Sequence, residues 1–178
     1  MSPRRPIAPA KEPALLRGLG FFREFTLPEL RRLARAGSLS TYDDGEFLAT
    51  EGTRKQRRIL YVVLQGKLQY VKRVRGARAN AVLTLLPGDV GGFLTFFNDD
   101  PSPVSVQSAG RSRVFEIGRR EFQVLMADQP TLVVKVLMAL LRATASRLEV
   151  FLEQVAATAA WAMDLQHHLR ALPLAEEA

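Results

Sequence analysis

Two adjacent glycines followed by an apolar turn form the segment of this chain best suited to hold a ligand. Gly91 and Gly92 permit close approach of the backbone, and the amides that open the turn at residues 93–97 are able to bind an anion at a helix start. A hydroxyl follows at Ser102. The segment predicts a ligand-binding loop that uses mainly its backbone, with these contacting residues: Gly91, Gly92, Phe93, Leu94, Ser102, Pro103, Val104 and Ser105.

Basic residues gather in two turns, at residues 54–58 and 72–78, and near residues 111–120, in a chain of net charge +7. Such clusters favour nucleic acid or an anionic surface, because each paired phosphate releases counterions. Charge clusters in turns are also often only solvated, so both interpretations stay open. If the loop holds a phosphate, the candidate partners are Arg73, Arg75, Arg111 and Arg113.

Catalytic chemistry is poorly supported. The chain has no cysteine, which excludes thiolate nucleophiles and thiolate metal sites. Its two histidines, His167 and His168, stand near Asp164 on a long helical pattern, where a solvated helix face is a better interpretation than a metal site. We therefore expect a non-enzymatic protein with no metal and no cofactor.

The amino-terminal segment, residues 1–12, carries three prolines among basic and small residues and predicts a flexible tail. It lacks the apolar core of a signal peptide, and no run approaches the length of a membrane span. These features, with the absence of cysteine, predict a cytoplasmic protein without a membrane span.

Residues 13–130 predict one domain in which helices precede a β unit. Pro13 suits the start of a short helix that ends at Gly18, and the spacing of Thr26 and Glu29 predicts a capping box for a helix that stops at Gly37. From residue 38 to 118, short apolar runs separated by glycine turns predict about eight strands in an antiparallel jelly roll, including a hairpin of residues 59–64 and 68–71. A helix over residues 120–127 follows.

Residues 131–172 predict one long helix, and residues 173–178 a short tail. Apolar residues recur in heptads along it and predict a parallel homodimer, because a helix this long exceeds the span of its own domain. A helix folded back on that domain is the alternative. The predicted interface comprises Leu137, Leu141, Thr144, Leu148, Phe151, Val155, Thr158, Ala162, Leu165 and Leu169.

Several landmarks, in order, resemble the cyclic-nucleotide-binding domain of the catabolite activator protein and protein kinase A regulatory subunit superfamily. They are the opening helix signature at residues 21–30, Asp44-Gly45-Glu46 with Glu51-Gly52, the central strands at residues 60–70, Leu86-Pro87-Gly88-Asp89, and the segment at residues 88–106. The resemblance covers residues 14–152. It implies a double-stranded β-helix (the jelly roll), mainly β with flanking helices and a long C-terminal dimerisation helix.

The resemblance also implies how the loop is altered. In the family a glutamate holds the ribose 2'-hydroxyl and an arginine the cyclic phosphate; here Phe93 and Ser102 stand at those positions. Three interpretations stay open: a closed barrel filled by Phe93, Phe96 and Phe97, a different ligand such as a cyclic dinucleotide, or ordinary cAMP or cGMP sensing. The catabolite activator branch continues into a DNA-binding domain, and with only residues 173–178 after the helix we expect no sequence-specific DNA binding. The leading hypothesis is a dimeric bacterial regulatory or scaffolding protein that acts on a protein partner.

Overall fold

The computed structural model describes residues 7–9, 13–53, 58–73, 80–98 and 100–171. The chain divides into two compact units, residues 1–140 and 141–178. The first contains all the strands among the described residues, and the second contains the distal part of one long helix. No helix in these residues is both long and apolar enough to cross a membrane.

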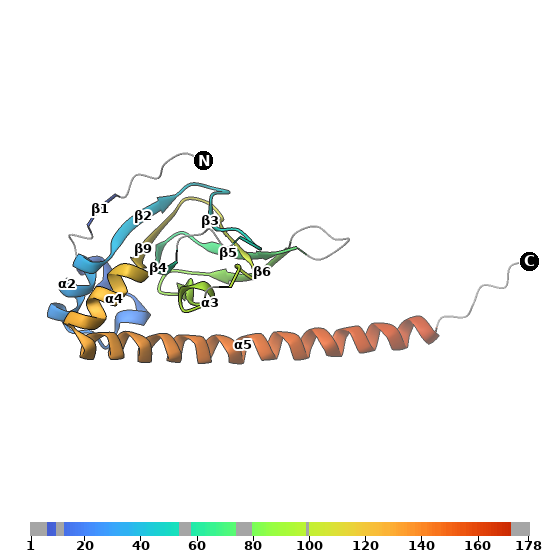
Figure 1. Cartoon of the computed structure of the whole chain (residues 1–178). Helices are drawn as coiled ribbons and strands as arrows, with labels where there is room; N and C mark the ends of the chain where they lie inside the picture. Colours follow the sequence, from blue (N-terminus) through green and yellow to red (C-terminus); the bar gives the residue numbers. More distant parts are fainter. Residues whose placement is uncertain (1–6, 10–12, 54–57, 74–79, 99, 172–178) are drawn as a thin grey trace, which may run out of the picture. The chain divides into compact units, whose positions relative to one another are not determined.

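Two antiparallel sheets form the body of the first unit (Figure 1). One sheet has the order β1-β2-β9-β4-β7 and the other β3-β8-β5-β6, and this confirms the predicted antiparallel jelly roll. The described strands are β1 (Ile7–Pro9), β2 (Ser38–Tyr42), β3 (Phe47–Ala49), β4 (Ile59–Gln65), β5 (Leu68–Lys72), β6 (Asn80–Leu85), β7 (Val90–Gly91), β8 (Ser105–Ser108) and β9 (Ser112–Gly118). Strand β1 pairs with β2 inside the segment for which the sequence predicts only a tail.

The core lies between the two sheets and is built by alternation along the strands. In β4 the side chains of Ile59, Tyr61 and Val63 enter it, and in β5 those of Leu68 and Tyr70 do so, because successive side chains of a strand point to opposite faces. Glu116 is the buried carboxylate of β9, and its Oε1 accepts a hydrogen bond from the Tyr42 hydroxyl. The full buried cluster is Tyr42, Leu48, Ile59, Tyr61, Val63, Leu68, Tyr70, Leu85, Val106 and Val114.

The predicted hairpin of residues 59–64 and 68–71 is wrong. Strand β4 pairs with β7 and β9, whereas β5 pairs with β6 and β8, so the turn at Gly66 carries the chain from one sheet to the other. The start of β9 occupies the space where the hairpin partner would pair. Ser112 Oγ accepts a hydrogen bond from Lys67 N and donates one to Lys67 O, and a Cβ at Gly66 would lie 2.4 Å from Arg111 O.

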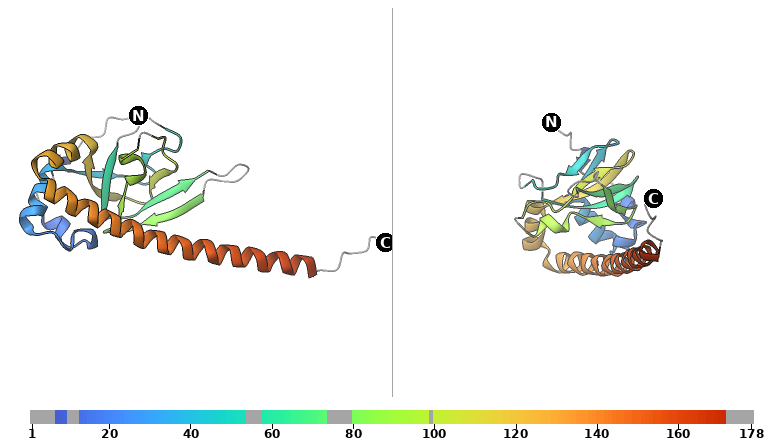
Figure 2. Two further views of the ribbon diagram at one scale, coloured as in Figure 1. Left: turned by 60° about the horizontal axis from the view of Figure 1, so that its bottom comes forward. Right: turned by 90° about the vertical axis from the view of Figure 1, so that its right-hand side faces the viewer.

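Helices cover one end of the barrel. They are α1 (Ala14–Arg17), the 3₁₀ helix η1 (Gly20–Phe22), α2 (Leu27–Ala36), α3 (Phe93–Phe96) and α4 (Arg119–Asp128). The capping box of α2 is confirmed, with Thr26 N donating to Glu29 Oε2 at 2.6 Å. Helices α2 and α4 lie side by side at this end (Figures 1 and 2).

Helix α5 (Pro130–Ala171) is the long predicted helix, and its first part belongs to the first unit (Figure 2). Its buried side chains there are Leu132, Val133, Val136, Ala139 and Leu140. Lys135 Nζ also donates to Glu29 Oε2 at 2.9 Å and lies 5.3 Å from the centroid of the Phe25 ring. These contacts join α5 to the start of α2.

The distal part of α5, in the second unit, exposes apolar side chains on several faces. Trp161 is 65% exposed and Met163 71% exposed within the single chain. At the predicted dimer seam the same holds for Leu141, Leu148, Phe151, Val155 and Leu165. The Thr158 hydroxyl donates to Gln154 O at 2.8 Å, so this polar seam residue is satisfied by its own helix. The side chain of Leu169 lies outside the described residues.

Candidate functional site

The glycine pair of the predicted loop sits where strand β7 meets helix α3. Gly92 has φ 90° and ψ −14°, in the left-handed region that favours glycine. A Cβ there would lie 2.0 Å from Ile59 O, and a Cβ at Gly91 would lie 2.6 Å from the Tyr61 ring. The loop backbone is therefore pressed against β4, and both glycines are required by this contact.

The phenylalanines after the glycines pack toward α4. The ring of Phe96 is buried, with its centroid 5.0 Å from that of Phe97 and 5.3 Å from that of Phe122. Phe93 begins the short helix α3 and is half-buried. The rings of Phe96 and Phe97 hold α3 against Phe122 in the first turn of α4.

Ser102 is buried, and its hydroxyl is used inside the protein. Its Oγ donates to Val104 O at 2.7 Å, and its carbonyl accepts a hydrogen bond from Gly52 N at 2.9 Å. Pro103 and Ser105 are held by hydrogen bonds as well. Pro103 O accepts one from Lys72 Nζ at 2.7 Å, and Ser105 Oγ accepts one from Glu51 N at 3.0 Å. The polar atoms of this segment are thus committed to internal bonds.

A cavity of only about 20 Å³ separates the loop from the barrel. That volume is enough for about one water molecule, whereas ligand pockets are usually about 300–1,000 Å³. Four of the residues predicted to contact a ligand lie on it, Gly92, Leu94, Ser102 and Val104. The remaining lining residues are Leu48, Ala49, Ile59, Tyr61, Tyr70, Thr95 and Val106.

Tyrosine rings, not phenylalanines, fill this space. The hydroxyls of Tyr61 and Tyr70 lie 3.4 Å apart, and both side chains are buried. Burial, and then the neighbouring Tyr70, raises the pKa of Tyr61 well above its ordinary value. Phe93, Phe96 and Phe97 are not among the lining residues, so the rings that border the cavity are not the ones that the sequence suggests.

A comparison of the sequence with known protein families gives a match over this part of the chain. The family model of the cyclic nucleotide-binding domain matches residues 39–129. The chain belongs to this family. Domains of this family have regulatory roles and are typically not catalytic. No curated protein matches the chain.

Solved structures agree on the fold. A cyclic nucleotide-binding domain from Methylobacillus flagellatus KT has a TM-score of 0.72 at 19% identity, over 82% of this chain and 80% of its own. The catabolite activator protein of Thermus thermophilus has a TM-score of 0.62 at 19% identity, over 76% of this chain and 62% of its own.

A third structure is the regulatory subunit of a cAMP-independent protein kinase A from Trypanosoma brucei, in a triple mutant bound to cAMP in its A site. It has a TM-score of 0.60 at 22% identity, over 74% of this chain and 45% of its own. The chain thus spans less than two thirds of the catabolite activator protein and of this subunit.

Three of the predicted phosphate partners, Arg73, Arg111 and Arg113, lie in the described part of the chain and do not line the small cavity. Arg111 is exposed, with Nε 3.8 Å from Asp43 Oδ1, and Arg113 lies in β9 opposite Thr41. The backbone of Arg73 donates to Glu51 Oε2 at 3.1 Å. Arg75, with most of the basic turns at residues 54–58 and 72–78, lies outside the described residues.

Glu51 is the residue near the loop that sequence reasoning missed. It accepts a hydrogen bond from Lys72 Nζ at 2.6 Å and holds the Arg73 backbone, and these two bonds lower the pKa of Glu51 below its ordinary value. An anion beside Lys72 would have to compete with this carboxylate. The inward tyrosines, Tyr61 and Tyr70, were also missed, although the alternation of β4 and β5 carries that signal.

Proposed function

We propose that this chain is a dimeric regulatory domain that does not bind cAMP in the manner usual for its fold and acts instead through contacts with protein. The observation that carries the proposal is the cavity of about 20 Å³ beside Gly92 and Ser102. A nucleoside cyclic phosphate is far larger than one water molecule, so binding would require Tyr61 and Tyr70 to leave the core.

Electrostatics support the same proposal. A buried cyclic phosphate needs a charge-assisted partner, which a bidentate arginine supplies and a serine hydroxyl does not. Among the residues that the structure describes, those that line the cavity include no arginine and no lysine. Ser102 also has its donor engaged by Val104 O, so it has no free proton to offer.

The fold itself does not require cAMP. The Trypanosoma brucei regulatory subunit belongs to a protein kinase A described as cAMP-independent, and its cAMP-bound form carries three substitutions, one of which introduces an arginine. A barrel of this shape therefore serves regulation in proteins that differ in their use of the nucleotide. We infer that the present chain acts in regulation without binding the nucleotide.

The exposed face of α5 supports the dimer. Residues 154–163 contain no charged side chain, and all of them are exposed in the single chain. A helix that is apolar around most of its surface is normally covered by other elements. Pairing two copies along the seam from Leu141 to Leu165 covers much of this surface and gives the regulatory domain a fixed twofold partner.

Isothermal titration of the full chain with cAMP, cGMP and a cyclic dinucleotide tests the nucleotide part of the proposal. We expect no binding at micromolar concentrations, with the Trypanosoma brucei triple mutant as the positive control for cAMP. Micromolar binding of cAMP or cGMP would overturn this part. Binding of the cyclic dinucleotide alone would instead make the chain a sensor of a different ligand.

A further inference from the structure

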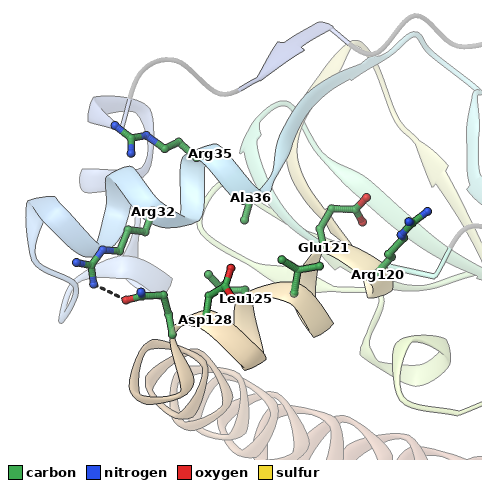
Figure 3. A pocket seen from close by; sticks show the side chains of 9 residues that line it. Arg32, Arg35, Ala36, Arg120, Glu121, Leu125 and Asp128 are labelled. Atoms are coloured by element: carbon green, nitrogen blue, oxygen red, sulfur yellow. Dashed lines mark hydrogen bonds between the residues drawn. The ribbon is translucent and has the colours of Figure 1, made fainter.

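A groove lies between helices α2 and α4 (Figure 3). Its volume is about 540 Å³, within the usual range for ligand sites. Residues spaced along one face of each helix form its walls. They are Arg32, Arg35 and Ala36 from α2, Arg120, Glu121, Val124, Leu125 and Asp128 from α4, and Gln129 at the helix end.

A hydrogen bond crosses the groove, and a second hollow adjoins it. Arg32 Nη1 donates to Gln129 Oε1, which ties the wall of α2 to the end of α4 (Figure 3). Ala36, Arg120 and Glu121 also line a second cavity of about 700 Å³. The two hollows thus share three wall residues.

The middle of the groove is apolar. Ala36 from α2 faces Val124 and Leu125 from α4, and Val124 is 56% exposed. An exposed valine with a small alanine opposite it leaves a place where an aliphatic side chain of a ligand can be buried. Burying such a side chain is the main favourable term in most protein association.

The rim of the groove is positive. Five arginines line the two hollows, Arg32, Arg35, Arg58, Arg119 and Arg120, against the three carboxylates Glu116, Glu121 and Asp128. Of these carboxylates, Glu116 is buried and accepts a hydrogen bond from Tyr42, and the Glu121 side chain lies over Gly118, where a Cβ would be 2.2 Å from its Oε2. Among the described residues, Arg35 and Arg120 have no hydrogen-bond or ion-pair partner.

We propose that this groove binds an acidic peptide segment of a partner protein, with an aliphatic side chain on Val124 and carboxylates on Arg35 and Arg120. The proposal rests on the proposed function in protein contacts and adds the surface and the chemistry of the partner. A guanidinium binds a carboxylate through two parallel hydrogen bonds, which gives both strength and orientation. The apolar side chains between the arginines favour a peptide, which can bury an aliphatic side chain there, over a nucleic-acid backbone, which binds mainly through its phosphates.

Fluorescence anisotropy with the full chain tests the groove. The probe is a labelled peptide of glutamate and leucine with leucines at helical spacing, and we expect a dissociation constant on the order of 10 μM. One matched peptide replaces glutamate by lysine, another replaces leucine by serine, and both should bind at least about tenfold more weakly. A single-stranded oligonucleotide is the fourth probe.

Three groove variants are compared with one control in which an exposed arginine outside the groove is replaced by glutamate. Arg35→Glu, Arg120→Glu and Val124→Asp should each weaken binding of the glutamate–leucine peptide by about tenfold or more. Arg31→Glu should change it by less than about twofold, because Arg31 is exposed on α2 but does not line the groove. Circular dichroism and thermal melting check that every variant is folded, since the changed side chains are all at the surface.

Several outcomes overturn the proposal. They are no binding of the glutamate–leucine peptide, equal binding of the lysine–leucine peptide, no effect of the groove variants, or oligonucleotide binding that the arginine variants abolish. Each leaves the proposed function intact, because that function is tested separately by nucleotide titration and by sedimentation. If those two tests fail and the peptide still binds, the proposed function is wrong and the peptide-binding groove stands.

Discussion

The hydroxyl oxygens of Tyr61 and Tyr70 lie 3.4 Å apart inside the barrel, on the wall of the cavity next to the glycine loop. The two rings come from strands of different sheets, β4 and β5, and meet at the centre of the core. The small cavity is thus bordered by two side chains that also belong to the hydrophobic core.

Replacing Tyr70 with alanine should therefore open the cavity without producing a receptor. We expect Tyr70→Ala to lower the free energy of unfolding by about 3 kcal/mol, because a large buried ring leaves a hole that the core fills only in part. It should gain no micromolar cAMP binding, since the described residues around this cavity include no cation. Urea unfolding followed by circular dichroism measures the loss. Leu86→Ala, at an exposed position, is the control and should cost less than about 1 kcal/mol.

Restoring an arginine at position 102 should fail to restore cAMP binding. Ser102 is 5% exposed, and none of the described residues that line the cavity is a carboxylate, so a guanidinium there would be buried without a charged partner on the cavity wall and we expect Ser102→Arg to cost about 3 kcal/mol or more. Ser102→Ala removes only the bond to Val104 O and should cost about 1 kcal/mol. Thermal melting with and without about 1 mM cAMP distinguishes the cases, because a ligand that binds only the folded state raises the melting temperature. A clear rise for Ser102→Arg alone would contradict the filled cavity.

The ion pair of Glu29 and Lys135 should make stability depend on acid pH. Burial opposes the shift, but the hydrogen bonds from Lys135 and Thr26 hold the pKa of Glu29 below its ordinary value of 4.5. A carboxyl with a lowered folded pKa stabilises the protein above its unfolded pKa, and this contribution is lost as pH falls through the folded pKa.

Lys135→Met should thus lower the free energy of unfolding by about 1 kcal/mol at neutral pH, and the difference from the wild type should shrink below pH 4.5. Urea unfolding at a fixed protein concentration across this range gives the measurement. Arg23→Met is the matched control, because Arg23 and Glu24 form a pair of exposed side chains. A difference that stays constant with pH would show that Lys135 acts through packing alone.

Charged substitutions in the predicted dimer seam of α5 should change the oligomeric state of the protein. Leu148→Glu and Val155→Glu place a charge at positions that face the partner helix in the predicted heptads, so we expect both to change a dimer into a monomer in sedimentation at tens of micromolar. Ala160→Glu lies on the opposite side of the helix and should leave the dimer intact. A wild-type chain that sediments as a monomer would remove the dimer from the proposed function.

Most of the fold is visible in the sequence because local signals there agree. The capping box of Thr26 and Glu29, the glycine turns and the heptads each predict an element that the structure contains. The prediction for the β4–β5 connection was wrong because a glycine turn between two strands has the same sequence pattern whether the strands pair with each other or enter different sheets. Contacts from Arg111 and Ser112, more than forty residues away, decide between the two.

The site was harder to predict for a related reason. Phe93 and Ser102 signal that the family's polar contacts are replaced, but nothing in their own types says which side chains fill the space. That depends on how two sheets face each other, which places Tyr61 opposite Tyr70. The groove of Arg35, Arg120 and Val124 likewise joins two helices more than eighty residues apart in sequence, and no periodicity within either helix reveals it.

The chain contains one tryptophan, Trp161, on the exposed distal part of α5. An indole that moves from water into a helix interface emits at shorter wavelength, so the intrinsic fluorescence of the unlabelled protein follows this one position. Serial dilution should shift the emission to the red as copies separate. The protein thus carries its own optical probe of assembly, placed far in sequence from both the glycine loop and the arginine groove.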